Sequence, residues 1–191
     1  MSTDTHLTAT PGQTIGPFFH FALLFDHDRE LVPPGSPGAV RLHGHVYDGE
    51  GQGLQDAMVE IRQADAGGDI PAVEGSLRRD GTLFTGWGRS STDPTGHWWF
   101  STIEPGATTP GRPAFFAVTV FARGLLNRLF TRIYLPGADE DLTTDPLLSS
   151  LPADERVRLV AVRDGANSLR FDIHLQGPEE TPFLTFPRHR D

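Results

Sequence analysis

Apolar and polar residues alternate in several short stretches of the chain, and turn-forming residues separate these stretches. Residues 40–46 and 57–61 carry mostly apolar side chains at every second position, and large aromatic residues do so within 97–101. Between the first two stretches lies the sequence Asp-Gly-Glu-Gly-Gln-Gly at 48–53. A period of two that is interrupted by glycine-rich turns predicts half-buried β-strands.

The clearest alternation lies in the C-terminal part of the sequence. Residues 157–161 and 169–175 both alternate, and Asp-Gly-Ala-Asn at 164–167 lies between them. This arrangement predicts a β-hairpin. Helical periodicity is nearly absent, although Asp145 and Pro146 are suited to begin one short helix. We therefore predict an all-β protein with long loops, at most one short helix and roughly seven to nine strands in an antiparallel β-sandwich or barrel.

Two adjacent phenylalanines indicate that one strand is covered on both faces. Phe115 and Phe116 begin an apolar stretch that extends to Ala122. Neighbouring side chains on a strand point to opposite faces of the sheet. Either the chain itself covers both faces at this point, or one of the two aromatic rings meets a partner chain.

Composition and charge exclude several classes of protein. The 191 residues contain no cysteine, which excludes disulfides and thiolate metal sites, and their number suits a single domain over 1–191. The net charge is −9, and all 16 basic residues are arginines without a basic run. Nucleic acid is therefore not expected as a partner. No apolar run approaches the roughly 18 residues of a membrane helix, and we expect a cytoplasmic protein.

One histidine pair has the spacing of metal ligands. His43 and His45 are two residues apart on a predicted strand, so their side chains point the same way. Two imidazoles can hold a metal ion, but a third ligand is not evident from the sequence. The alternative interpretation is a polar outer face of the sheet next to Arg41.

Eight short motifs occur in an order that resembles a known enzyme family. The motifs lie at 13–17 (Gln-Thr-Ile-Gly-Pro), 44–49, 60–65, 88–90, 96–100, 121–124 (Phe-Ala-Arg-Gly), 131–134 and 170–173. Together they are similar to the alpha subunits of the protocatechuate 3,4-dioxygenase family, which are parts of intradiol ring-cleaving enzymes, and the similarity extends from about residue 10 to 186.

The resemblance implies a β-sandwich of the intradiol dioxygenase type and a chain without iron ligands. In the family's catalytic beta chain, two tyrosines and two histidines hold Fe(III). The histidine positions correspond here to Phe115 and Ala117, and one tyrosine position corresponds to Ile70. The second tyrosine has no counterpart in the Pro-Gly segment at 105–110. Since phenyl and alkyl groups have no lone pair for a hard cation, we expect no metal site here and Fe(III) in a partner beta subunit.

The resemblance also assigns a substrate pocket to this chain, although no catalytic residue. Thr14, Gly16 and Pro17 match the family's N-terminal motif, and Arg123 matches the Phe-Ala-Arg-Gly motif. We expect the N-terminal segment, at about 8–30, to dock beside the partner's iron. Gly16 and Pro17 would supply a stiff backbone wall, and Arg123 a permanent positive charge for an anionic aromatic acid. Alternatively, Arg123 forms a structural ion pair at the partner interface.

The reaction implied by the resemblance is cleavage of protocatechuate (3,4-dihydroxybenzoate) by O2 to 3-carboxy-cis,cis-muconate. Two other hypotheses remain open from the sequence. One is a self-sufficient catechol-type dioxygenase with an unusual metal site that includes His43 and His45. The other is a non-catalytic β-sandwich binding module.

Overall fold

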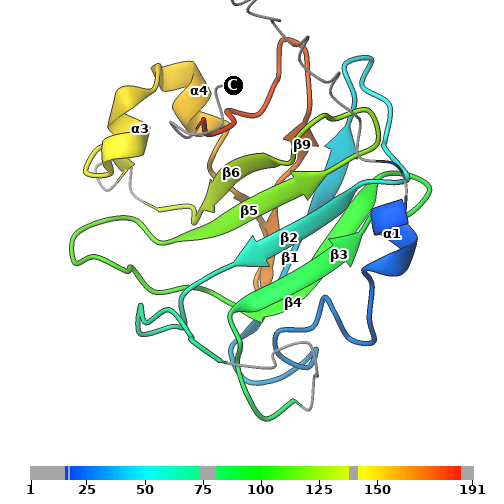
Figure 1. The fold of residues 1–191 in the computed structure, drawn as a ribbon. Coiled ribbons are helices and arrows are strands. Elements are labelled where there is room, and N and C mark those ends of the chain that lie inside the picture. The colour runs from blue at the N-terminus through cyan, green and yellow to red at the C-terminus, as the bar shows by residue number, and fades with distance from the viewer. Residues whose placement is uncertain (1–15, 17, 74–80, 138–141, 186–191) are drawn as a thin grey trace, which may run out of the picture.

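The computed structural model describes residues 16, 18–73, 81–137 and 142–185. Two β-sheets pack against each other as the layers of a sandwich, and in Figure 1 the layer with β2, β3, β5 and β6 lies in front of β1. The first sheet contains β1 (Ala39–Tyr47), β4 (His97–Ile103), β7 (Val162–Gly165), β8 (Ser168–Arg170) and β9 (Ile173–His174). The second sheet contains β2 (Met58–Arg62), β3 (Trp87–Ser91), β5 (Phe115–Phe121) and β6 (Leu129–Tyr134).

The predicted antiparallel sandwich is confirmed, with one difference at β1. The second sheet has the order β3-β2-β5-β6, and all its neighbours are antiparallel. In the first sheet, of order β4-β1-β8-β7, β1 is antiparallel to β4 but parallel to β8 and β9. Parallel neighbours need a long crossover between them. The whole second sheet and the helical segment after β6 supply that crossover.

The alternation in residues 40–46 is confirmed on β1. Leu42 and Val46 are fully buried in the core between the sheets, whereas His43 and His45 on the opposite face are partly exposed. Gly44 shares the buried face, and a Cβ atom at this position would lie 1.7 Å from the carbonyl oxygen of Phe171. Glycine is therefore required where the C-terminal strands approach β1.

The prediction of at most one short helix is wrong. Three five-residue helices occur among the described residues: α1 (Phe18–Ala22), α3 (Pro146–Ser150) and α4 (Ala153–Val157). The expected helix is α3, in which the Asp145 carboxylate accepts from the backbone N–H groups of the first turn. A helix of little more than one turn is too short to show a period of 3.6 in the sequence. None of the helices described is long and apolar enough to cross a lipid bilayer.

The predicted C-terminal hairpin is confirmed, but its first strand begins later than expected. β7 and β8 pair antiparallel, with Val162 opposite Arg170. Val157, interpreted as part of the strand, ends α4 and is 64% exposed. Leu159 is nevertheless buried, because its carbonyl accepts from Tyr134 N–H and draws this segment onto the second sheet.

Both faces of β5 are covered by the chain itself at the two adjacent phenylalanines. Phe116 is fully buried in the main core. Phe115, on the opposite face, packs against a second apolar cluster that includes Tyr134 and Leu148 of α3. Figure 1 shows α3 and α4 together beside β6, on the side of the sandwich remote from α1.

Candidate functional site

Phe19 and Phe25 of the N-terminal segment lie on the outer face of the second sheet. The Phe19 ring of α1 lies 6.1 Å, centroid to centroid, from Phe121 at the end of β5. Further along, Phe25 stacks on Trp87 of β3 at 6.0 Å. The expected docking segment therefore has an intramolecular anchor over at least part of its length.

Of the residues expected in the substrate pocket, Gly16 and Arg123 can be placed. Thr14 and Pro17 lie outside the described residues, and Gly16 is exposed. Arg123 follows β5 by two residues, so it lies at the same end of the sheet as α1. Its guanidinium forms a 2.8 Å ion pair with the Asp56 carboxylate, while 57% of its side chain stays exposed. One carboxylate occupies only part of the five-donor guanidinium, so further donors remain for another anion.

An arginine lies beside Phe115 and Ala117, which we expect at the histidine positions of the family. Phe115 and Ala117 share the outer face of β5, and Arg132 of β6 is opposite Ala117. The Arg132 guanidinium carbon lies 4.1 Å from the Phe115 ring centroid, and one nitrogen donates to the Tyr134 hydroxyl at 3.0 Å. The same nitrogen lies 3.6 Å from the buried Asp145 carboxylate.

This cluster is unsuited to a metal ion. Burial raises the pKa of the Tyr134 phenol to about 12, so the phenol is neutral at ordinary pH and its conversion to a phenolate ligand is disfavoured. Arg132 keeps its charge at any ordinary pH and opposes a second cation nearby. The sequence alone did not indicate Arg132, because only the register of β5 and β6 brings it next to Ala117.

The two loops that we expect at the family's tyrosine positions, at 65–70 and 105–110, are in contact with each other. The N–H of Gly106 donates to the carbonyl of Asp65 at 2.7 Å. A Cβ atom on Gly68 would lie 2.3 Å from the carbonyl oxygen of Ala107, so the two backbones are in close contact. Ile70 lies just beyond and is 59% exposed. The fold thus brings together the two loops that the resemblance assigns to the tyrosine positions.

The histidine pair lies on the outer face of the first sheet, where carboxylates accompany it. His43 Nε2 lies 2.9 Å from Asp164, and His45 Nδ1 lies 3.6 Å from Asp172. The His97 ring lies 5.1 Å from the His45 ring and 5.8 Å from the His43 ring. Within the described part of the chain, no group of three or more His, Cys, Asp or Glu is placed to hold a metal ion. The geometry thus gives no support to the self-sufficient metalloenzyme.

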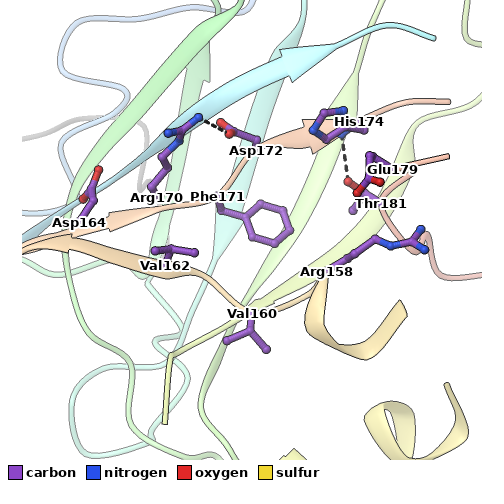
Figure 2. A pocket seen from close by; sticks show the side chains of 10 residues that line it. All are labelled: Arg158, Val160, Val162, Asp164, Arg170, Phe171, Asp172, His174, Glu179 and Thr181. Atoms are coloured by element: carbon purple, nitrogen blue, oxygen red, sulfur yellow. Dashed lines mark hydrogen bonds and ion pairs between the residues drawn. The ribbon is translucent and has the colours of Figure 1, made fainter. Parts of the chain in front are cut away.

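Two cavities are formed by other parts of the molecule. The first, of about 450 Å³, opens where β7 diverges from β9, and Figure 2 shows its apolar floor between charged side chains. Its floor is formed by Val160, Val162 and Phe171, and its rim carries Arg158, Asp164, Arg170, Asp172 and Glu179. The second, of about 590 Å³, lies beside β1 and β4. Neither cavity includes Gly16, Arg123 or the positions of the missing ligands.

Comparison with known proteins decides the family. A family model described as a dioxygenase matches residues 15–177. The chain belongs to this dioxygenase family. The protocatechuate 3,4-dioxygenase alpha chain of Burkholderia cepacia is 35% identical to it over 196 residues, which cover 94% of this chain and 98% of that one. The beta chain from the same organism is 32% identical over 197 residues, with 94% and 80% covered.

A solved structure gives the same result for the fold. The dioxygenase domain of a dioxygenase and carbohydrate-binding fusion from Streptomyces sp. SirexAA-E superposes with a TM-score of 0.57 at 26% identity. The match covers 89% of this chain and 99% of that domain. The resemblance to alpha subunits and the intradiol dioxygenase type of sandwich are thereby confirmed. Since relatives carry the names of alpha and beta chains, a heteromeric arrangement is implied for this dioxygenase chain as well.

Proposed function

We propose that this chain is the alpha subunit of a heteromeric ferric dioxygenase that cleaves protocatechuate with O2. The carbon–carbon bond between the two hydroxyl-bearing carbons breaks, and each of these carbons receives one atom of O2. The product is 3-carboxy-cis,cis-muconate. Fe(III), held by the partner beta subunit, would make the bound catechol reactive towards O2. We further place the enzyme in the cytoplasm.

The observation that supports an iron site in the beta subunit alone is the cluster around Arg132, which lies where we expect the family's iron ligands. Phe115 and Ala117 stand at the histidine positions, and the Arg132 guanidinium lies against Phe115. A guanidinium that is already paired with Tyr134 and Asp145 opposes a second cation at this position. We therefore assign the metal of the active enzyme to the partner beta subunit.

In the proposed complex, this chain binds and orients the aromatic acid. Arg123 is held on one side by Asp56 and keeps most of its side chain accessible, which suits contact with a substrate carboxylate. The anchored N-terminal segment would bring the backbone of Thr14, Gly16 and Pro17 against the substrate and exclude water from it. The segment would dock on the beta subunit through the residues ahead of its intramolecular anchor at Phe19.

Purification of the chain with and without its beta subunit tests this proposal. Alone, the chain should contain no stoichiometric iron and lack the visible absorption of iron–phenolate charge transfer. Co-expressed with the beta subunit, it should yield a coloured complex that consumes O2 only when protocatechuate is added. A chain that binds one Fe(III) by itself and turns over protocatechuate alone would contradict the proposal, as would a beta subunit that is fully active without it.

A further inference from the structure

The second cavity is an open hollow lined by two turns, the beginning of β1 and the middle of β4. It has a volume of about 590 Å³, and its walls combine apolar side chains with one guanidinium. The backbone N–H of Arg41 donates to the carbonyl of Asn167 at 2.9 Å, which fixes the hairpin turn against β1. The residues that matter for its chemistry are Pro34, Ala39, Val40, Arg41, Trp99 and Asn167.

The charge of this cavity is opposite to that of the molecule. Among the described residues that line it, Arg41 is the single ionisable side chain, and no carboxylate is present. Arg41 is exposed and takes part in no ion pair with the described part of the chain. The first cavity, in contrast, has three carboxylates on its rim. In a protein of net charge −9, an acid-free cavity with an uncompensated guanidinium favours an anion.

An aromatic surface lies next to this guanidinium. The Arg41 guanidinium carbon is 5.8 Å from the Trp99 ring centroid, and that of Arg29 is 5.1 Å away. The two arginines therefore add positive charge around the half-buried indole. A flat ring can pack against the part of the indole that the two guanidiniums leave accessible and against the other apolar walls, while its charged substituent reaches Arg41.

We propose that this cavity binds a monocyclic aromatic carboxylate, with the carboxylate on Arg41 and the ring against Trp99. The volume lies within the range of small-molecule sites, and mostly apolar walls with few polar groups are typical of them. An inorganic anion would leave the apolar walls unused, and a single guanidinium balances the charge of a carboxylate but only half that of a phosphate dianion. None of the residues assigned to ring cleavage lines the cavity, so the inference does not rest on the proposed function.

Titration of the purified full chain with benzoate and with benzamide, followed by calorimetry, tests the site. Benzoate lacks both catechol hydroxyls, so it cannot undergo ring cleavage, and benzamide is its neutral isostere. We expect saturable one-to-one binding of benzoate that is clearly tighter than that of benzamide. Arg41→Gln should weaken benzoate binding about tenfold or more and leave benzamide unchanged, since a charge-assisted hydrogen bond is lost.

Two further variants make the test specific. Arg112→Gln removes another exposed guanidinium, from a turn outside the cavity, and this variant should bind benzoate like the wild type. Trp99→Leu should weaken both ligands, because the ring loses its stacking surface. Circular dichroism checks that each variant is folded. Equal affinity for benzoate and benzamide, wild-type affinity in Arg41→Gln, or no saturable binding at millimolar concentrations would each overturn the proposal.

Discussion

The Arg123 side chain is held by an ion pair with Asp56 and is still exposed enough to contact a ligand. The alternative role expected from the sequence is an ion pair at the partner interface, whereas the ion pair with Asp56 lies within this chain. Because Asp56 is nearly buried and Arg123 is mostly exposed, the carboxylate serves as a fixed anchor for the longer side chain. A guanidinium held in this way loses less conformational entropy when it binds a ligand.

Separate substitutions of Arg123 and Asp56 distinguish a role of Arg123 in substrate binding from a purely structural role. In the complex with the beta subunit, Arg123→Gln should raise KM for protocatechuate about tenfold or more, because a charge-assisted hydrogen bond to the substrate is lost. Iron content should stay at the wild-type level. Asp56→Asn removes the ion pair but keeps the guanidinium, so its effect on KM should be much smaller. If the two variants raise KM equally, or if neither does, Arg123 has only a structural role.

Among the secondary-structure elements, α3 depends on one buried carboxylate. Asp145 accepts hydrogen bonds from the N–H groups of Leu147 and Leu148, and it also lies next to the Arg132 guanidinium. The helix contributes Leu148 to the second apolar cluster. The Asp145 carboxylate therefore caps α3 and also compensates the charge of Arg132.

The stability of the chain should respond strongly to this residue. Asp145→Ala removes the helix cap and leaves the guanidinium without its countercharge, so we expect a loss of about 2 kcal/mol in the free energy of unfolding. Urea denaturation measures this change. Asp154→Ala, in the first turn of α4, removes an exposed carboxylate and should cost less than about 0.5 kcal/mol. Equal losses in the two variants would contradict the assigned role of Asp145.

At the scale of the whole molecule, the outer faces of the two sheets carry different chemistry. The first sheet presents a cluster of imidazoles, in which His97 lies beside His43 and His45 and faces Asp93 and Arg41. Burial, followed by the charges of His45 and Arg41, holds the pKa of His97 below its ordinary value of 6.5. Asp93 opposes this shift without reversing it.

This shift predicts how stability depends on pH. With the lower pKa in the folded state, the unfolded chain binds the His97 proton more tightly, so stability falls as the pH drops through 6.5 and is fully retained above it. His97→Gln should reduce the loss of unfolding free energy between neutral and mildly acidic solution. Urea denaturation across this pH range provides the measurement. An unchanged pH dependence in the variant would show that His97 does not contribute.

The sequence was sufficient for the sandwich and the family, but not for several contacts that decide the chemistry. Alternation identified β1 and the β7–β8 hairpin, because strand patterning depends on local residues. The same pattern predicted a strand wrongly at Val157, which is the last residue of the short helix α4. The Arg132 cluster depends on the pairing of β5 with β6, which no local pattern encodes. Docking of the expected segment at 8–30 and the single domain over 1–191 stay predictions.

The parallel pairing of β1 with β8 and β9 has a consequence during synthesis of the protein. β1 is made early, yet the partners on one of its edges come from the last third of the polypeptide. Until these strands leave the ribosome, that edge presents unpaired N–H and C=O groups together with the apolar residues of the core. Premature termination ahead of Val162 therefore leaves a template for intermolecular strand pairing, and such truncated products should aggregate rather than accumulate as folded fragments.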